Sequence, residues 1–237
     1  MPPIRAGIVA NPASGRDIRR LTAKASVFPT AEKAQMVQRL LGAFGRFGID
    51  EVLMMPDTTG ISALVGREVL RRQNERDGVW PSVTFVDIAG ADSVADTYAA
   101  VDLMCAAGVS IIAVLGGDGT HRAVAKRCGE TPLLTLSTGT NNVFPDLREA
   151  TVAGIAGALV ATGRIPRAAG LRRNKLLRVR VAGPRGPSAD IALVDICVAR
   201  AAHVGSRAIW RTADVRELYV TFAEEDAIGL SSLVAQW

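Results

Sequence analysis

The chain has 237 residues, of which 49% are hydrophobic and 5% aromatic, and its formal net charge is +5. This length and composition suit one large or two modest globular domains with a sizeable core. No apolar run approaches the ~20 residues of a membrane-spanning helix, and the first residues lack the basic and apolar regions of a secretory signal. Cys105, Cys128 and Cys197 have no ligand-like spacing, which predicts buried thiols. We therefore expect a cytoplasmic protein without membrane contact.

The positive charge is concentrated in one segment. Between Arg164 and Arg185 there are eight basic residues and no acidic residue. Such a segment can steer a polyanion such as ATP or NAD toward a cleft. The alternatives are a patch for nucleic acid or anionic lipid, and a solvated linker and hairpin face. No nucleic-acid-binding motif accompanies the segment, so we expect no nucleic-acid partner.

Apolar strands alternate with helical stretches in the first part of the chain. One predicted helix places Leu40, Leu41, Phe44 and Phe47 at separations of three and four on one face. The predicted strands are residues 4–10, 51–55, 82–88, 109–115 and 132–136, and the predicted helices are residues 30–47, 59–76, 92–107 and 120–127. This repeated order predicts an α/β fold with a doubly wound parallel sheet.

The alternation ends near residue 146. An Ala-rich helix is predicted at residues 147–162, a hairpin of residues 174–182 and 189–199 around the turn-rich segment 183–188, and a further strand at 216–222. We therefore divide the chain into an α/β nucleotide-binding domain (1–146), a connecting helix (147–164) and a partial β-rich second domain (165–237). Three or four strands are too few for a closed β-sandwich. Exposed strand edges would favour a homo-oligomer.

The segment Gly116-Gly117-Asp118-Gly119-Thr120, here called the glycine loop, follows the strand predicted at 109–115. Adjacent glycines let the backbone turn sharply and approach a ligand. Asp118 is thereby placed at the carboxyl end of a parallel strand, where open α/β sheets bind ligands. Its carboxylate could hold Mg²⁺ or accept a proton from an attacking hydroxyl. The structural alternative is a plain turn in which Asp118 caps a helix that begins at Thr120.

Two further polar loops follow predicted strands. The asparagine loop (residues 11–16) offers an anion its backbone N–H groups, the Ser14 hydroxyl and Arg16. The threonine loop (residues 137–144) offers small polar side chains that suit ribose hydroxyls or an adenine edge. The alternatives are a turn without phosphate contacts in the first case and an Asx turn in the second. We expect His121 to be a bystander, and we assign no chemistry to Lys126.

Together the three loops resemble those of the NAD kinase/diacylglycerol kinase superfamily. Within it, the residues Arg16 to Arg20, Met55-Pro56-Asp57 and Thr140 to Pro145 resemble the AcoX-type (acetoin catabolism protein X) ATP-NAD kinase branch. The resemblance covers about residues 4–200 and more loosely the remainder. Families of this kind have a longer β-rich domain, so we expect the second domain here to be truncated. A separate Asn-Glu/Asp pair, which holds the dinucleotide in NAD kinases, has no clean equivalent.

The resemblance implies roles for the loop residues. The aspartate matching Asp118 activates the ribose 2′-hydroxyl that is phosphorylated, and Mg²⁺ organisation is its alternative role. The remaining residues that the resemblance and the loop chemistry assign to nucleotide or phosphate binding are Asn11, Ser14, Gly15, Arg16, Gly116, Gly117, Gly119, Thr120, Thr138, Gly139, Thr140, Asn141 and Asn142.

The function implied is transfer of a phosphoryl group from ATP to a hydroxyl, in the first place the 2′-hydroxyl of NAD, with Mg²⁺ as the cofactor. The expected partners are the nucleotides ATP and NAD. A lipid or small-alcohol kinase is a second hypothesis, with the segment Arg164 to Arg185 at a membrane surface. A non-catalytic nucleotide-binding regulatory protein is a third.

Overall fold

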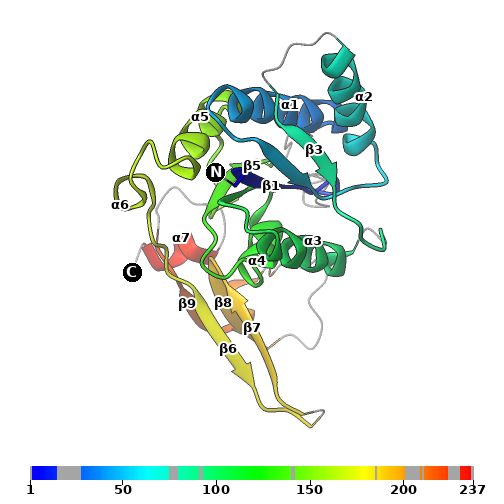
Figure 1. Ribbon diagram of the computed structural model, residues 1–237. Coiled ribbons are helices and arrows are strands. Elements are labelled where there is room, and N and C mark those ends of the chain that lie inside the picture. Colours follow the sequence, from blue (N-terminus) through cyan, green and yellow to red (C-terminus); the bar gives the residue numbers. More distant parts are fainter. Residues whose placement is uncertain are drawn as a thin grey trace.

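Five parallel strands form the central sheet of the computed structural model, which describes residues 2–14, 28–74, 80–90, 93–139, 142–184, 186–200, 209, 211–223 and 230–235 (Figure 1). The strands are β1 (Arg5–Ala10), β2 (Glu51–Met54), β3 (Ser82–Phe85), β4 (Ile111–Gly116) and β5 (Leu133–Ser137). Their order is β3-β2-β1-β4-β5, and every neighbouring pair is parallel. The predicted α/β class with a doubly wound parallel sheet is confirmed.

Helices cover both faces of this sheet. α1 (Thr30–Arg46), α2 (Ile61–Asn74) and α5 (Ala150–Ala161) cover one face, and α3 (Val94–Ala106) and α4 (Asp118–Ala125) cover the other (Figure 1). Ile8 packs into the cluster under the first set and Val9 into the cluster under the second. This alternation follows because successive side chains of a strand point to opposite faces.

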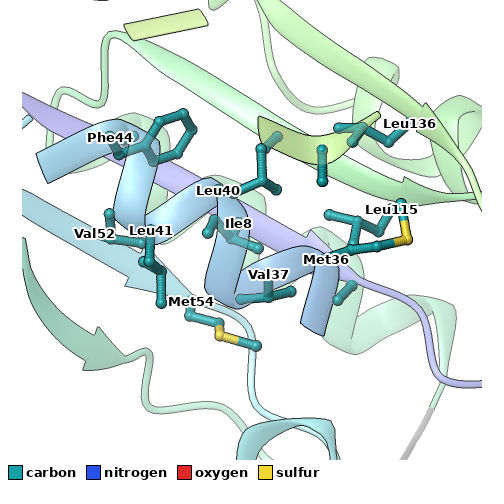
Figure 2. Close-up of a cluster of buried hydrophobic side chains, with 14 of the residues drawn as sticks. Ile8, Met36, Val37, Leu40, Leu41, Phe44, Val52, Met54, Leu115 and Leu136 are labelled. Atoms are coloured by element: carbon teal, nitrogen blue, oxygen red, sulfur yellow. The ribbon is translucent and has the colours of Figure 1, made fainter. Parts of the chain in front are cut away.

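The first of these clusters confirms the predicted apolar face of α1. Leu40, Leu41 and Phe44 are 0% exposed, and Figure 2 shows them directed at Ile8 and its neighbours on the sheet. Phe47 is the C-cap residue of α1 and packs at the edge of the cluster. Full burial of such a side chain contributes about 1.5–3 kcal/mol, so this face of α1 anchors the helix.

Local hydrogen bonding moves the starts of two helices from their predicted positions. α3 starts at Val94 because Ser93 and Asp96 form a reciprocal capping box. α4 starts at Asp118, before the predicted Thr120, because the extended Gly117 (φ −94°) is its N-cap. Other bounds also differ: β3 ends at Phe85, β4 runs from Ile111 to Gly116, and α2 starts at Ile61. The helix predicted at residues 147–162 is α5 (Ala150–Ala161), which starts later because the Glu149 side chain caps it by accepting from the Val152 amide.

Consecutive strands follow α5 and the short helix α6 (Arg167–Gly170), as predicted. β6 (Leu177–Val181) and β7 (Ser188–Ala192) form one antiparallel sheet, and β8 (Asp195–Ala199) and β9 (Val215–Val220) form another. η3 (Thr212–Asp214) leads into β9, and α7 (Leu230–Ala235) follows it. The second part of the chain is therefore β-rich.

The prediction of one strand over residues 189–199 was wrong. The segment divides at Leu193 and Val194, since β7 pairs with β6 whereas β8 pairs with β9. The Thr221 hydroxyl donates to the carbonyl oxygens of both residues, at 2.7 and 3.1 Å, and so holds the change of direction.

The thiols also differ from prediction. Cys128 is buried, but Cys105 and Cys197 are only partly buried. Cys105 lies in the last turn of α3, and Cys197 lies in a two-stranded sheet that is too thin to cover both of its faces. None of the three forms a disulfide. Separately, no helix within the described part of the chain has the length and apolar character needed to cross a membrane.

Candidate functional site

The carboxyl ends of β1, β4 and β5 lie side by side, which brings the three polar loops to one rim of the sheet. The Asn11 amide donates to the Leu115 carbonyl at 2.9 Å as the chain leaves β1. The Thr138 amide donates to the Gly116 carbonyl at 3.3 Å as the chain leaves β5. Loops that are far apart in the sequence therefore meet where open α/β sheets bind ligands.

Side-chain hydrogen bonds join the three loops to one another. The Asn11 amide nitrogen Nδ2 donates to Thr120 Oγ1 at 2.8 Å, which links the asparagine loop to the glycine loop. The Ser14 and Thr138 hydroxyls lie 2.6 Å apart, which links the asparagine loop to the threonine loop. These four side chains therefore set the relative positions of the loops.

The backbone N–H groups in the described part of the asparagine loop donate hydrogen bonds within the protein. Besides the Asn11 amide, the Ala13 amide donates to Asn11 Oδ1 at 2.9 Å and the Ser14 amide to the Asn11 carbonyl at 3.3 Å. Pro12 has no N–H. The N–H groups of residues 11, 13 and 14 therefore have protein acceptors, and anion binding by this loop stays a prediction that would depend on its side chains. Gly15 and Arg16, the other expected anion contacts of this loop, lie outside the described residues.

A lysine that sequence analysis passed over lies beneath this loop. Lys33 of α1 is 1% exposed. Its Nζ donates to the carbonyl oxygens of Asn11 (3.2 Å), Pro12 (2.9 Å) and Ser14 (2.6 Å). The available signal was its position on the apolar face of α1, seven residues before Leu40. A lysine on a buried helical face needs polar partners, and the loop supplies them.

The three glycines of the glycine loop have different surroundings. A Cβ on Gly116 would lie 2.5 Å from Thr120 Cβ, and one on Gly117 would lie 2.7 Å from Asn142 Oδ1. A Cβ on Gly119 would meet nothing within 4 Å. Packing inside the protein therefore requires Gly116 and Gly117, whereas Gly119 borders open space on the rim.

Asp118 connects the glycine loop to the threonine loop. Its carboxylate accepts hydrogen bonds from the backbone amides of Val143 (3.2 Å) and Phe144 (2.8 Å). Because α4 has Gly117 as its N-cap and no side-chain cap, the alternative in which Asp118 caps a helix beginning at Thr120 is wrong. Amide hydrogen bonds stabilise the negative charge and fix the carboxylate at the rim.

The described part of the threonine loop is held by its own side chains. Asn142 Nδ2 donates to Ser137 Oγ at 2.8 Å and to the Gly139 carbonyl at 3.3 Å. The Ser137 hydroxyl donates to the same carbonyl at 2.8 Å. In these contacts the Asn142 side chain donates, so they are not the Asx turn that was the structural alternative. Thr140 and Asn141 lie outside the described residues.

A second carboxylate, from the β-rich part, is within reach of the electric field of Asp118. Burial raises the pKa of Asp195 at the start of β8, and the negative charge of Asp118 raises it further. Sequence analysis did not single out Asp195, because no motif surrounds it. Its approach to Asp118 depends on how the hairpins pack against α4.

Ion pairs hold that packing. Asp190 of β7 accepts hydrogen bonds from Arg122 Nη1 (2.5 Å) and Lys126 Nζ (3.0 Å), both on α4, and Figure 1 shows α4 beside these strands. Partial burial raises the pKa of Asp190, but hydrogen bonds from Lys126, the Ile191 amide and Arg122 outweigh it and bring the pKa to about 2. Asp190 is therefore a carboxylate at neutral pH.

His121 is part of the interior. It is 0% exposed, its Nδ1 lies 2.9 Å from the Gly117 carbonyl oxygen, and its ring faces Phe144 at 5.9 Å between centroids. Burial lowers its pKa to about 4, although hydrogen bonds to the Gly117 and Val114 carbonyls oppose the shift. A neutral imidazole packed behind the glycine loop supports a structural role over contact with a phosphate.

The described surface also contains a depression of about 580 Å³ away from this rim. It lies between α1 and α2, and Arg39, Arg46, Arg72 and Trp80 are among its lining residues. No residue of the three polar loops lines it. The candidate site is therefore defined by the strand ends and not by this depression.

Two protein families and one known protein match the chain. Residues 6–165 match the family described as the ATP-NAD kinase N-terminal domain, and residues 175–237 match the acetoin catabolism protein X C-terminal domain. The chain is 46% identical over 228 residues to acetoin catabolism protein X of Cupriavidus necator. The aligned region covers 96% of this chain and 63% of the relative. The chain thus spans less than two thirds of that relative's length. No solved structure matches the chain.

Proposed function

The chain belongs to the ATP-NAD kinase family, and we propose that it transfers a phosphoryl group from ATP to the 2′-hydroxyl of NAD, giving NADP. The observation that carries the proposal is a set of three hydrogen bonds: from Asn11 to Thr120, between Ser14 and Thr138, and from Val143 to Asp118. They hold three loops and one carboxylate at a single rim. Phosphoryl transfer depends mainly on such positioning and on charge neutralisation.

In the proposed mechanism, Asp118 accepts the proton of the attacking hydroxyl. The amides of Val143 and Phe144 orient its carboxylate. The nucleotide phosphates lie against the exposed side of Gly119, where a Cβ would meet no other segment of the described chain within 4 Å. Gly15, Arg16, Thr140, Asn141 and the remaining loop residues named from the resemblance complete this nucleotide site.

Mg²⁺ is the cofactor that the family implies. Among the described residues, no three His, Cys, Asp or Glu side chains gather as a metal site. The Asp118 carboxylate at the rim nevertheless suits Mg²⁺, because this ion usually binds one or two carboxylates and completes its shell with water and substrate phosphates. When bound, Mg²⁺ would neutralise charge on the transferred phosphoryl group.

The first prediction concerns Asp118. Asp118→Asn removes the proton acceptor, so we expect NADP formation from MgATP and NAD to fall at least about 100-fold. Asp57→Asn is the matched control, since the Asp57 carboxylate also accepts backbone amides but at the start of α2. Full activity in Asp118→Asn would remove this residue from the mechanism. ATP binding by the wild-type chain without any turnover would favour the non-catalytic alternative.

A lipid or small-alcohol kinase is the second candidate. Arg178 and Arg180 are exposed and alternate along β6, and Arg172 and Arg173 are exposed just before it. Alternate residues of a strand share one face, so this surface could meet anionic headgroups. Salt-sensitive binding to anionic vesicles, together with phosphorylation of a lipid in them, would favour this candidate over the NAD kinase.

We also propose the division into residues 1–146, 147–164 and 165–237, and a homo-oligomer formed through the second of the two domains. The support is that β6–β7 and β8–β9 form separate two-stranded sheets. Val181, Val198 and Tyr219 on these strands are exposed large hydrophobic side chains, and open strand edges promote association. Light scattering on the purified chain would measure the oligomeric state.

A further inference from the structure

Lys33 is a buried cation that donates hydrogen bonds to three carbonyl oxygens of the asparagine loop. It is among the largest fully buried side chains of the protein. An ammonium group has three N–H donors, and three carbonyl oxygens, those of Asn11, Pro12 and Ser14, lie within 2.6–3.2 Å of Nζ. Burying a charge is unfavourable unless hydrogen bonds compensate it. Burial of Lys33 is therefore favourable only together with its hydrogen bonds to this loop.

The loop that Lys33 holds is also the one that contacts both other loops. Asn11 and Ser14 give their carbonyl oxygens to Lys33 and their side chains to Thr120 and Thr138. Moving the asparagine loop would thus break its cross-links to the glycine loop and the threonine loop together. Lys33 is the point at which α1 is attached to this network.

Carbonyl oxygens at a phosphate site repel the ligand, because both carry negative charge. At this rim the carbonyl oxygens of residues 11, 12 and 14 turn inward to Lys33 Nζ. Their partial negative charge is thereby directed away from the rim and compensated by a full positive charge. In the low dielectric of the interior, that compensation is stronger than it would be in water.

We infer that Lys33 is a positioning residue for the nucleotide phosphates, an inference that rests on the function proposed above. Its ammonium group binds the carbonyl oxygens of the asparagine loop, fixes Asn11 and Ser14 against Thr120 and Thr138, and places positive charge behind the phosphate site. Lys33 does not touch the ligand. Its loss should weaken ATP binding more than it weakens the fold.

The test compares Lys33→Met with Val37→Ala. Methionine keeps most of the buried volume but lacks the three donors. The control, Val37→Ala, changes a side chain that is 0% exposed and lies one turn further along α1, and it leaves the loop contacts intact. We expect the Kd for MgATP, measured by calorimetry on the folded proteins, to rise at least about tenfold in Lys33→Met, as for loss of a hydrogen bond to a charged group. In Val37→Ala it should stay within about twofold of wild type, since lost core packing lowers stability without altering the loop.

The outcomes separate the inference from the proposed function. If folded Lys33→Met binds MgATP like wild type, or Val37→Ala loses as much affinity, the positioning role is overturned while the kinase proposal stands. If the wild-type chain does not bind MgATP, the proposed function fails and the inference fails with it. If Lys33→Met does not fold, Lys33→Ala is titrated with MgATP in the presence and absence of propylammonium. Restored affinity with the amine supports the role, and no restoration overturns it.

Discussion

Gly117 and Gly119 differ in what surrounds them, although they lie in the same loop. A Cβ on Gly117 would meet Asn142 Oδ1, whereas a Cβ on Gly119 would meet no other segment of the described chain within 4 Å. The sequence motif treats the two residues alike. The structure separates a glycine that internal packing requires from one that the other described residues leave exposed.

This contrast gives a prediction at the residue scale. Gly119→Ala should fold with unchanged or slightly higher stability, by at most about 1 kcal/mol, because alanine is the better helix former. It should also bind MgATP about tenfold more weakly if phosphates approach this face. Gly117→Ala should instead lower the free energy of unfolding by about 1–3 kcal/mol through overpacking against Asn142. Urea unfolding and calorimetric titration measure the two effects, and unchanged affinity in Gly119→Ala would place the phosphates elsewhere.

At the scale of elements, the Asp57 side chain caps the start of α2. Its carboxylate accepts hydrogen bonds from the amides of Gly60, Ile61 and Ser62 and from the Thr59 and Ser62 hydroxyls. Burial raises the pKa of Asp57, but these hydrogen bonds outweigh it and leave the pKa below its ordinary value. Asp57 belongs to the Met55-Pro56-Asp57 segment of the family resemblance, and the structure gives it a capping role.

The prediction that follows concerns pH. Asp57→Ala should lower the free energy of unfolding at neutral pH by about 1 kcal/mol, as for loss of a helix cap. Because the folded-state pKa is lowered, this stabilisation is present above the unfolded-state pKa and is lost as the pH falls through the folded-state pKa. The stability difference between wild type and Asp57→Ala should therefore shrink at acidic pH. Urea unfolding at several pH values measures it, and a difference that grows toward low pH would contradict the assignment.

Element types were predictable where periodicity was strong. The alternation of apolar strands with one-sided helices such as α1 predicted the order of strands and helices along the chain, because each pattern is local in the chain. The break at Leu193 and Val194 was not predictable, since residues 189–199 are continuously compatible with a strand. Thr221, far along the chain, decides where that strand ends.

At the scale of the whole molecule, Asp190 ties the hairpins to the helix that carries Asp118. Its partners Arg122 and Lys126 both lie on α4, and the exposed fractions of the three side chains are 34–41%. Partly exposed ion pairs of this kind contribute about 0–1 kcal/mol each. The link is therefore strong enough to bias the placement of Asp195 near Asp118 and too weak to hold the fold by itself.

We expect Asp190→Asn to reduce kcat/KM for NAD roughly two- to fivefold, with the thermal midpoint nearly unchanged, because only the pairing with α4 is weakened. Raising the salt concentration should reduce wild-type activity toward that of the variant, since screening acts on the same pairs. Steady-state kinetics at low and high salt check both points. Equal salt dependence in the two proteins would show that the pairs do not affect catalysis.

The sequence by itself determined the chemistry class and the rim. Three polar loops after parallel strands must meet at one edge of the sheet, because the carboxyl ends of parallel strands lie together. Only the tertiary structure decided what each residue does there. That Lys33 lies beneath the asparagine loop, that Ser14 meets Thr138, and that Asp195 approaches Asp118 depends on contacts between distant segments. Local patterns cannot encode those distances, since they arise only when helices and hairpins pack on the sheet.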